Sequence, residues 1–144
     1  MQFQETSDGI IVVLGRGEKI VEQLGELVQA HEIPSGTITG LGAVMNTRLG
    51  FYHLPKKKYD ERTIPEEVEL VSLIGNITWF ENKPVVHVHA TIGTTDFRAM
   101  AGHLFEAQVA VTVEIFVSVK DVRVQRKFNP EMGLNLQCLL GTHS

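Results

Sequence analysis

The sequence has little of what stabilises a secreted protein or anchors a membrane protein. Its one cysteine, Cys138, excludes a disulfide bond within the chain. No apolar run approaches the roughly 20 residues that span a bilayer. The N-terminus has no basic start followed by an apolar stretch, which a secretory signal would show. We therefore expect a cytoplasmic protein without membrane association.

Excess positive charge is also missing. The chain has 13 lysines and arginines against 17 acidic residues, a formal net charge of −4, which argues against general attraction to nucleic acid. The most basic segment, Lys56–Lys58, is followed by Asp60 and Glu61, so its local field is largely cancelled. The polar segment Lys56–Arg62 therefore predicts a solvated hairpin or loop. No Arg-Gly-Arg-Pro core of an AT-hook occurs, and we predict no nucleic-acid-binding residues.

The sequence instead has the composition of one folded domain over residues 1–144, with 43% hydrophobic and 21% charged residues. Apolar residues at helical spacing predict a long helix over Glu18–His31. Most of the remainder indicates strands, and the alternating valines of Gln108–Lys120 are the clearest case. We expect an α+β fold: a mainly antiparallel sheet or half-barrel with one long N-terminal helix packed on it.

The boundaries of the other expected strands follow from short apolar runs separated by turn residues. These strands are Gly9–Arg16, Ser35–Ala43, Arg48–Leu54, Val68–Leu73, Gly75–Phe80 and Val85–Ile92, with shorter ones after Lys120.

Three of the six histidines lie close together in the sequence. His87 and His89 are two positions apart in an apolar run, so on a strand both imidazoles point to the same face. His103 follows within Ala101–Leu104. Three imidazoles with a water in the fourth position form an open zinc site. The pattern alone also allows a structural interpretation, in which half-buried histidines bond to backbone or carboxylate groups.

Several ordered motifs resemble the "plants and prokaryotes conserved" domain, abbreviated PPC, from about Gly9 to Val119. The motifs are Gly40–Ala43, Leu49–Tyr52, Glu69–Ile77, His87–Ala90 and Gly102–Leu104. The resemblance implies a compact homotrimeric subunit with the histidines near a cleft at the subunit boundary. Bacterial members have been called DNA-binding proteins by association with plant relatives that carry AT-hooks. Ala101 departs from the pattern, because a second glycine often stands there.

With His103 placed as in that family, we predict that His87, His89 and His103 bind a metal ion beside a small-molecule pocket. Zinc fits three imidazoles best, although other divalent transition metals use the same ligands. Catalysis would need an acid or base, for which Glu106 and Glu114 are the candidates. A solvated Glu106, and a Glu114 paired with an arginine such as Arg98 or Arg123, are the alternatives.

The sequence leaves open whether the protein is an enzyme. The alternative function is DNA binding or transcriptional regulation, as in the plant AT-hook relatives, although nucleic-acid binding is not expected from this chain alone. A third possibility is a trimeric scaffold whose histidines are structural.

Overall fold

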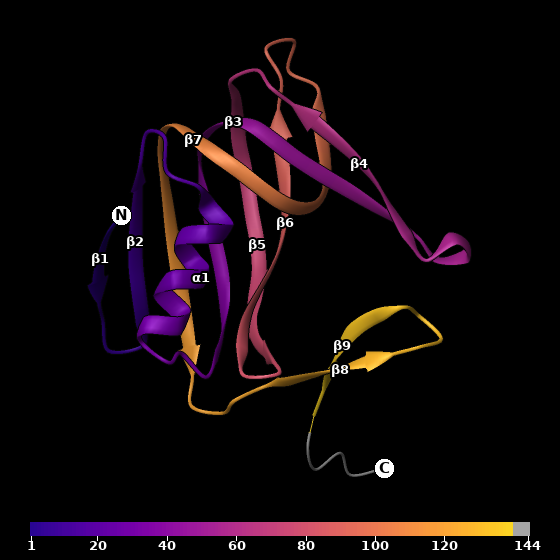
Figure 1. Cartoon of the computed structure of the whole chain (residues 1–144). Coiled ribbons are helices and arrows are strands. Elements are labelled where there is room, and N and C mark those ends of the chain that lie inside the picture. The colour runs from indigo at the N-terminus through magenta and orange to yellow at the C-terminus, as the bar shows by residue number, and fades with distance from the viewer. Residues whose placement is uncertain (140–144) are drawn as a thin grey trace.

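The described part of the chain, residues 1–139 of the computed structural model, is built mainly of strands (Figure 1). The strands are β1 (Gln2–Glu5), β2 (Gly9–Gly15), β3 (Ser35–His53), β4 (Lys58–Ile64), β5 (Val68–Phe80), β6 (Lys83–Gly93), β7 (Ala99–Lys120), β8 (Gln125–Asn129) and β9 (Leu134–Cys138). The helices are α1 (Ile20–Ala30) and a single 3-10 turn, Leu54–Lys56.

The expected fold class, α+β with one long N-terminal helix packed on the sheet, is wrong. All nine strands belong to one mixed sheet, since β5 pairs in parallel with β8 while the other pairs are antiparallel. The α-helix has only 11 residues and begins at Ile20, not Glu18. Lys19 has an extended backbone and forms a β-bridge with Gln108 of β7. The helix therefore cannot include Lys19, which the sequence placed in its first turn.

The central strands form a closed circuit of pairings. β3 pairs with β5 and β7, and β6 pairs with both β5 and β7, so hydrogen bonds run from β3 through β5, β6 and β7 back to β3. Register shifts between Gly40 and Gly42, and again beyond Gly42, let the long strand β3 bend along this path. β6 therefore has hydrogen-bonded neighbours on both sides.

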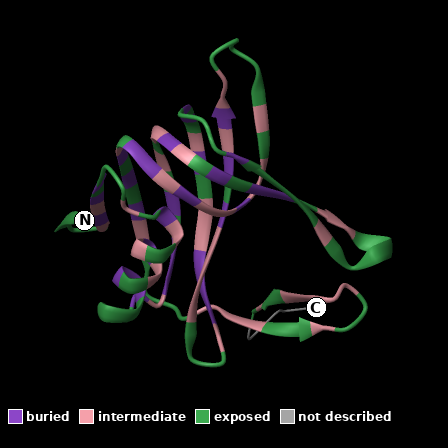
Figure 2. Ribbon diagram, turned by 45° about the horizontal axis from the view of Figure 1, so that its top comes forward, coloured by how far each residue is buried: buried purple, intermediate pink, exposed green. Residues whose placement is uncertain are grey.

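The core lies between the sheet and the helix. α1 directs Ile20, Leu24, Leu27 and Val28 toward the sheet, and all four are at most 2% exposed. These residues join one cluster with buried side chains from the central strands. Figure 2 shows buried positions concentrated in the sheet and on the helix, whereas the projecting hairpins are mostly exposed or intermediate.

Two hairpins extend from this body and contact each other. One joins β3 to β4, and the other joins β8 to β9 near the C-terminal end of the described chain. The Tyr52 hydroxyl donates to the Met132 carbonyl oxygen at 2.6 Å, and Lys57 Nζ donates to the Pro130 carbonyl oxygen at 2.7 Å. These bonds fix the β8–β9 hairpin against the first hairpin.

Within residues 1–139, no helix has the length and apolar character needed to cross a membrane.

Gly75 provides a test of how closely β5 and β6 approach each other. A Cβ atom added at Gly75 would lie 2.2 Å from the His87 carbonyl oxygen, a backbone atom that moves only if the strands separate. We expect Gly75→Ala to lower the free energy of unfolding by about 1–3 kcal/mol or more in urea titrations. At Gly25 in α1 an added Cβ meets nothing within 4 Å, so Gly25→Ala is the matched control. The control should leave stability unchanged or raise it by up to about 1 kcal/mol, and equal losses in both variants would contradict this account.

Candidate metal site

Strand alternation places the first two histidines on one face of β6. Val88, Ala90 and Ile92 point into the core and are at most 2% exposed, so His87 and His89 point to the opposite face. His87 is partly buried and His89 is exposed. The core-facing apolar residues therefore fix the direction of both imidazoles.

The pairing of β6 with β7 brings the third histidine beside them. In this antiparallel register His89 lies directly opposite His103, and Gly102 lies opposite Ala90. Ala101, at the position where the family often has glycine, is not among the residues with positive φ. Alanine is therefore accommodated there without a left-handed backbone conformation.

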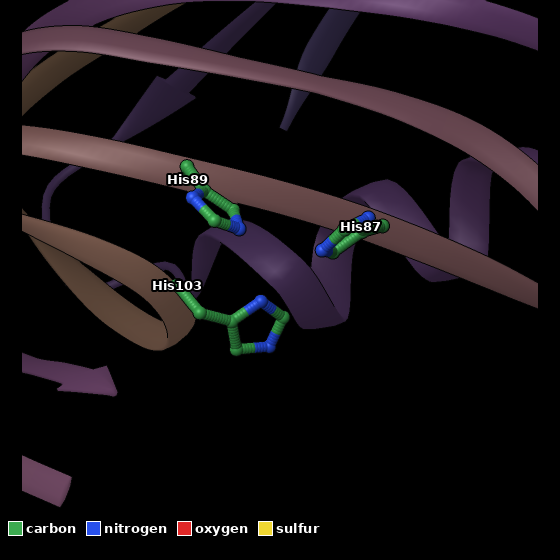
Figure 3. A group of neighbouring side chains, drawn as sticks. All are labelled: His87, His89 and His103. Carbon is green, nitrogen blue, oxygen red and sulfur yellow. The ribbon is translucent and has the colours of Figure 1, made fainter. Parts of the chain in front are cut away.

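The three imidazoles converge on a common space (Figure 3). Ring centroids are 5.2 Å apart for His87 and His89, 5.2 Å for His87 and His103, and 5.5 Å for His89 and His103. One nitrogen from each ring lies within 4.8 Å of the corresponding nitrogens on the other two. Tetrahedral zinc with bonds of about 2.0–2.1 Å needs donors roughly 3.4 Å apart, a difference that small side-chain rotations can close. The histidine triad could therefore hold a metal ion.

The protonation state and hydrogen bonding of the triad also suit a metal. Nδ1 of His103 is buried and has no hydrogen-bond partner among the described residues, an arrangement that costs free energy unless something binds there. Burial and, after it, the charge of Arg126 lower the pKa of His87 to about 4. Burial likewise lowers the pKa of His103. Both imidazoles are therefore neutral near pH 7, the form that binds metals.

Arg126 of β8 reaches across β5 to the triad. Its Nη2 donates to Nδ1 of His87 at 3.2 Å and to Oδ1 of Asn76 at 3.2 Å. Its Nε donates to the Thr78 hydroxyl at 2.7 Å, and Nη1 donates to the Asn135 carbonyl oxygen at 2.8 Å. Within residues 1–139, no carboxylate lies within ion-pair distance of this partly buried guanidinium. The site thus combines three imidazoles with one cation.

Aromatic rings flank His103. The Tyr59 ring centroid lies 5.2 Å from that of His103, and the Phe105 centroid lies 4.8 Å from it in an edge-to-face arrangement. Burial raises the pKa of the Tyr59 hydroxyl, which therefore stays protonated near neutral pH. This side of the triad is consequently aromatic and uncharged.

The two glutamates that the sequence suggested for acid–base chemistry lie elsewhere. Glu106 accepts hydrogen bonds from the backbone N–H groups of Val21 and Glu22 at 2.8 and 3.1 Å, and so caps the N-terminus of α1. Glu114 is exposed, opposite Leu41 in the sheet. The arginines considered for Glu114 have other contacts: Arg98 pairs with Asp96, and Arg123 stacks on Trp79 with its guanidinium carbon 3.9 Å from the ring centroid. Neither glutamate joins the histidine cluster.

The expected small-molecule pocket beside the triad is not confirmed. A cavity of about 500 Å³ is lined by residues such as Val71, Phe97 and Val111, and by none of the three histidines. A cavity of about 240 Å³ includes Met100 and Ala101, close in sequence to His103, but not His103 itself.

Fold and site together define a class of protein: a single strand-rich sheet whose paired strands carry three histidines able to hold a metal ion. The chain belongs to the Plants and Prokaryotes Conserved (PCC) domain family, the same family as the PPC domain, because the family model matches residues 1–120. The resemblance predicted from the sequence motifs is therefore confirmed. No curated protein matches the chain significantly.

Solved structures of similar proteins agree with this assignment. A "putative DNA-binding protein" of Bacteroides thetaiotaomicron is 32% identical with a TM-score of 0.92, and the match covers 95% of this chain and 96% of that one. A protein of the same description from Ralstonia eutropha is 31% identical with a TM-score of 0.88, covering 96% of both chains. A metal-containing protein of Archaeoglobus fulgidus is 29% identical with a TM-score of 0.84, covering 96% of this chain and 99% of that one.

Sequence reasoning missed Arg126 and Tyr59 as neighbours of the triad. Tyr59 lies in a segment predicted as a hairpin or loop, which is in fact mostly β4. Arg126 lies in a short C-terminal strand without any motif. A partial signal existed for Glu106: it lies three positions after His103, and an odd separation on a strand places two side chains on opposite faces.

The role of Glu106 as a helix cap leads to a prediction about stability. We expect Glu106→Ala to lower the free energy of unfolding by about 0.5–2 kcal/mol, because the N–H groups of Val21 and Glu22 lose their acceptor. Glu106→Gln keeps one acceptor oxygen and should cost less. Chemical denaturation measures both losses, and metal content measured in parallel should equal that of the unmodified protein. A selective loss of bound metal would contradict this assignment.

Proposed function

We propose that the protein binds a divalent transition metal ion through His87, His89 and His103 and uses it to bind a small molecule. The observation that carries the proposal is the convergence of three ligand nitrogens within 4.8 Å, together with the buried, unpartnered Nδ1 of His103. The 29%-identical Archaeoglobus protein described as metal-containing supports it.

Zinc is the proposed ion. It accepts neutral imidazoles in tetrahedral geometry, and three protein ligands leave its fourth position open to an external ligand. Bound zinc supplies a Lewis acid that polarises an oxygen ligand. The chain's own contribution is to orient the imidazoles from two rigid strands and, by burial, to keep those of His87 and His103 neutral. Nickel or copper would use the same three ligands.

The proposal does not include a reaction. Glu106 caps a helix, and Glu114 is exposed outside the histidine cluster, so neither is a base positioned beside the ion. Binding of a ligand at the open metal position is the activity that the geometry supports.

We also propose that the protein is a homotrimer, as the family resemblance implies. An exposed apolar patch on the outer face of the sheet supports self-association. Ile74 and Phe116 both lie opposite Thr39, on the two strands that flank β3, and are 61% and 56% exposed. Leu41, Val71 and Val111 on the same three strands are 55%, 58% and 67% exposed. Ile74 is also directly opposite His89, so a subunit covering the patch would approach the triad.

DNA binding remains the alternative, and the descriptions of the Bacteroides and Ralstonia proteins favour it. Lys56, Lys57 and Lys58 are exposed at the tip of the β3–β4 hairpin, where they could contact phosphates. However, Lys57 Nζ is hydrogen-bonded to the Pro130 carbonyl oxygen, and the chain's net charge is −4. The histidine triad has the more specific geometry, so metal binding is the function we propose.

Metal analysis of protein purified without an affinity tag tests the metal site. We expect about one zinc ion per chain, and substitution of His87, His89 or His103 by alanine should remove most of it, because each supplies one of three ligands. Mass spectrometric metal analysis after dialysis gives the stoichiometry.

The matched control is His31→Ala. His31 lies next to Phe3 and Glu5, away from the triad, so its loss should leave metal content unchanged. Equal metal content in all four variants, or none in the unmodified protein, would defeat the proposal.

The trimer is tested by sedimentation equilibrium. The expected mass is three times the 16.0 kDa of one chain. Phe116→Glu should dissociate the assembly, because it places a charge within the apolar patch. Phe128→Glu is the control, since Phe128 on β8 is 61% exposed but lies outside the patch. A monomeric unmodified protein at high concentration would rule out the trimer.

A further inference from the structure

We propose that Arg126 is the ligand-recognition residue of the metal site, and that the ligand is a small carboxylate bridging the metal ion and the Arg126 guanidinium. The inference deepens the proposed metal-binding function and rests on it. It follows from the contacts of Arg126 with the triad and from the charge of those contacts.

The guanidinium is held in place by neutral groups alone. Its contacts among the described residues are a hydroxyl, a backbone carbonyl, an amide oxygen and an imidazole nitrogen. An arginine kept partly buried for structural reasons is ordinarily paired with a carboxylate. Here the positive charge is positioned beside the triad without a counterion among residues 1–139. A divalent ion at the triad would add two further positive charges, which makes an anion the complementary ligand.

The hydrogen bond to His87 determines what metal binding does to Arg126. In a neutral imidazole one ring nitrogen has a free lone pair and the other carries a proton. Because the Arg126 Nη2 N–H group donates to Nδ1 of His87, Nδ1 is the nitrogen with the lone pair. If the metal binds Nδ1, it takes that lone pair. If it binds Nε2, then Nδ1 carries a proton and becomes a donor facing another donor. In either case metal binding would release the Nη2 N–H group from His87.

The released N–H group needs an acceptor, and a carboxylate provides one with suitable geometry. One of its oxygens would take the open metal position, and the other would accept from Nη2. Guanidinium has five N–H groups, and one on Nη1 has no acceptor among the described residues, so a second bond to the carboxylate is available. Inorganic phosphate has four oxygens where a carboxylate has two, so it would need more donors. The Tyr59 and Phe105 rings suit an organic group attached to the carboxylate.

The test uses cobalt(II) in place of zinc, because the visible absorption of tetrahedral cobalt(II) changes when its fourth ligand is exchanged. Acetate, propionate and inorganic phosphate are titrated into the cobalt-loaded protein. We expect both carboxylates to bind more tightly than phosphate. Arg126→Met should weaken carboxylate binding by about tenfold or more, because one charge-assisted hydrogen bond is lost. The number of cobalt ions bound per chain should stay the same.

Arg123→Met is the matched control. It removes the same charge from the segment leading to β8, but Arg123 is exposed and stacks on Trp79. Its carboxylate affinity should stay within about twofold of the unmodified protein, because exposed charges act weakly at a distance. Arg126→Lys keeps the charge and loses the planar guanidinium, so its carboxylate affinity should fall between those of Arg126→Met and the unmodified protein. This variant also decides the question if Arg126→Met does not fold.

The outcomes separate the two proposals. Failure of the unmodified protein to bind cobalt overturns the metal site and this inference with it. Cobalt binding with equal carboxylate affinity in all variants overturns the role of Arg126 alone. Tighter binding of phosphate than of acetate and propionate overturns the ligand class.

Discussion

The pairing of β6 with β7 is the interaction on which both fold and site depend. It closes the circuit of β3, β5, β6 and β7 and sets His89 opposite His103. Burial of Val88, Ala90 and Ile92 fixes this register, since a slip of one residue would exchange the core-facing and outward-facing side chains of β6. The hydrophobic free energy that stabilises the core therefore also positions the imidazoles. Because all three come from strands rather than loops, the cluster is held rigidly.

The sequence predicted where many strands begin but not how far they extend. Ser35–Ala43 and Arg48–Leu54 are parts of one strand, β3, because bulges let it bend where the apolar pattern is interrupted. Val68–Leu73 and Gly75–Phe80 were expected as two strands separated by a turn, but β5 runs through both without interruption, and the missing side chain of Gly75 admits β6. The polar segment Lys58–Ile64 forms β4. Its sequence does not alternate between apolar and polar residues, because most of its side chains are exposed.

The candidate site was only partly predictable, for a related reason. The spacing of His87 and His89 determines their common face, whereas the position of His103 was implied by the family resemblance and follows from the register of β6 with β7. Arg126 could not be predicted, because it reaches the triad through tertiary packing of β8 against β5. Glu106 was suggested by nearness in sequence, yet it points to the helix on the opposite side of the sheet.

The matched family segment ends at residue 120, so the three histidines lie inside it, whereas Arg126 lies beyond it on the β8–β9 hairpin. That hairpin is joined to the body through the pairing of β8 with β5, the contacts of Arg126 and the bonds from Tyr52 and Lys57. The two proposals thus assign metal binding and ligand choice to separate stretches of the chain. An exchanged hairpin could alter which anion is selected while the sheet and its imidazoles stay as they are, which makes this segment a natural point for selectivity to diverge.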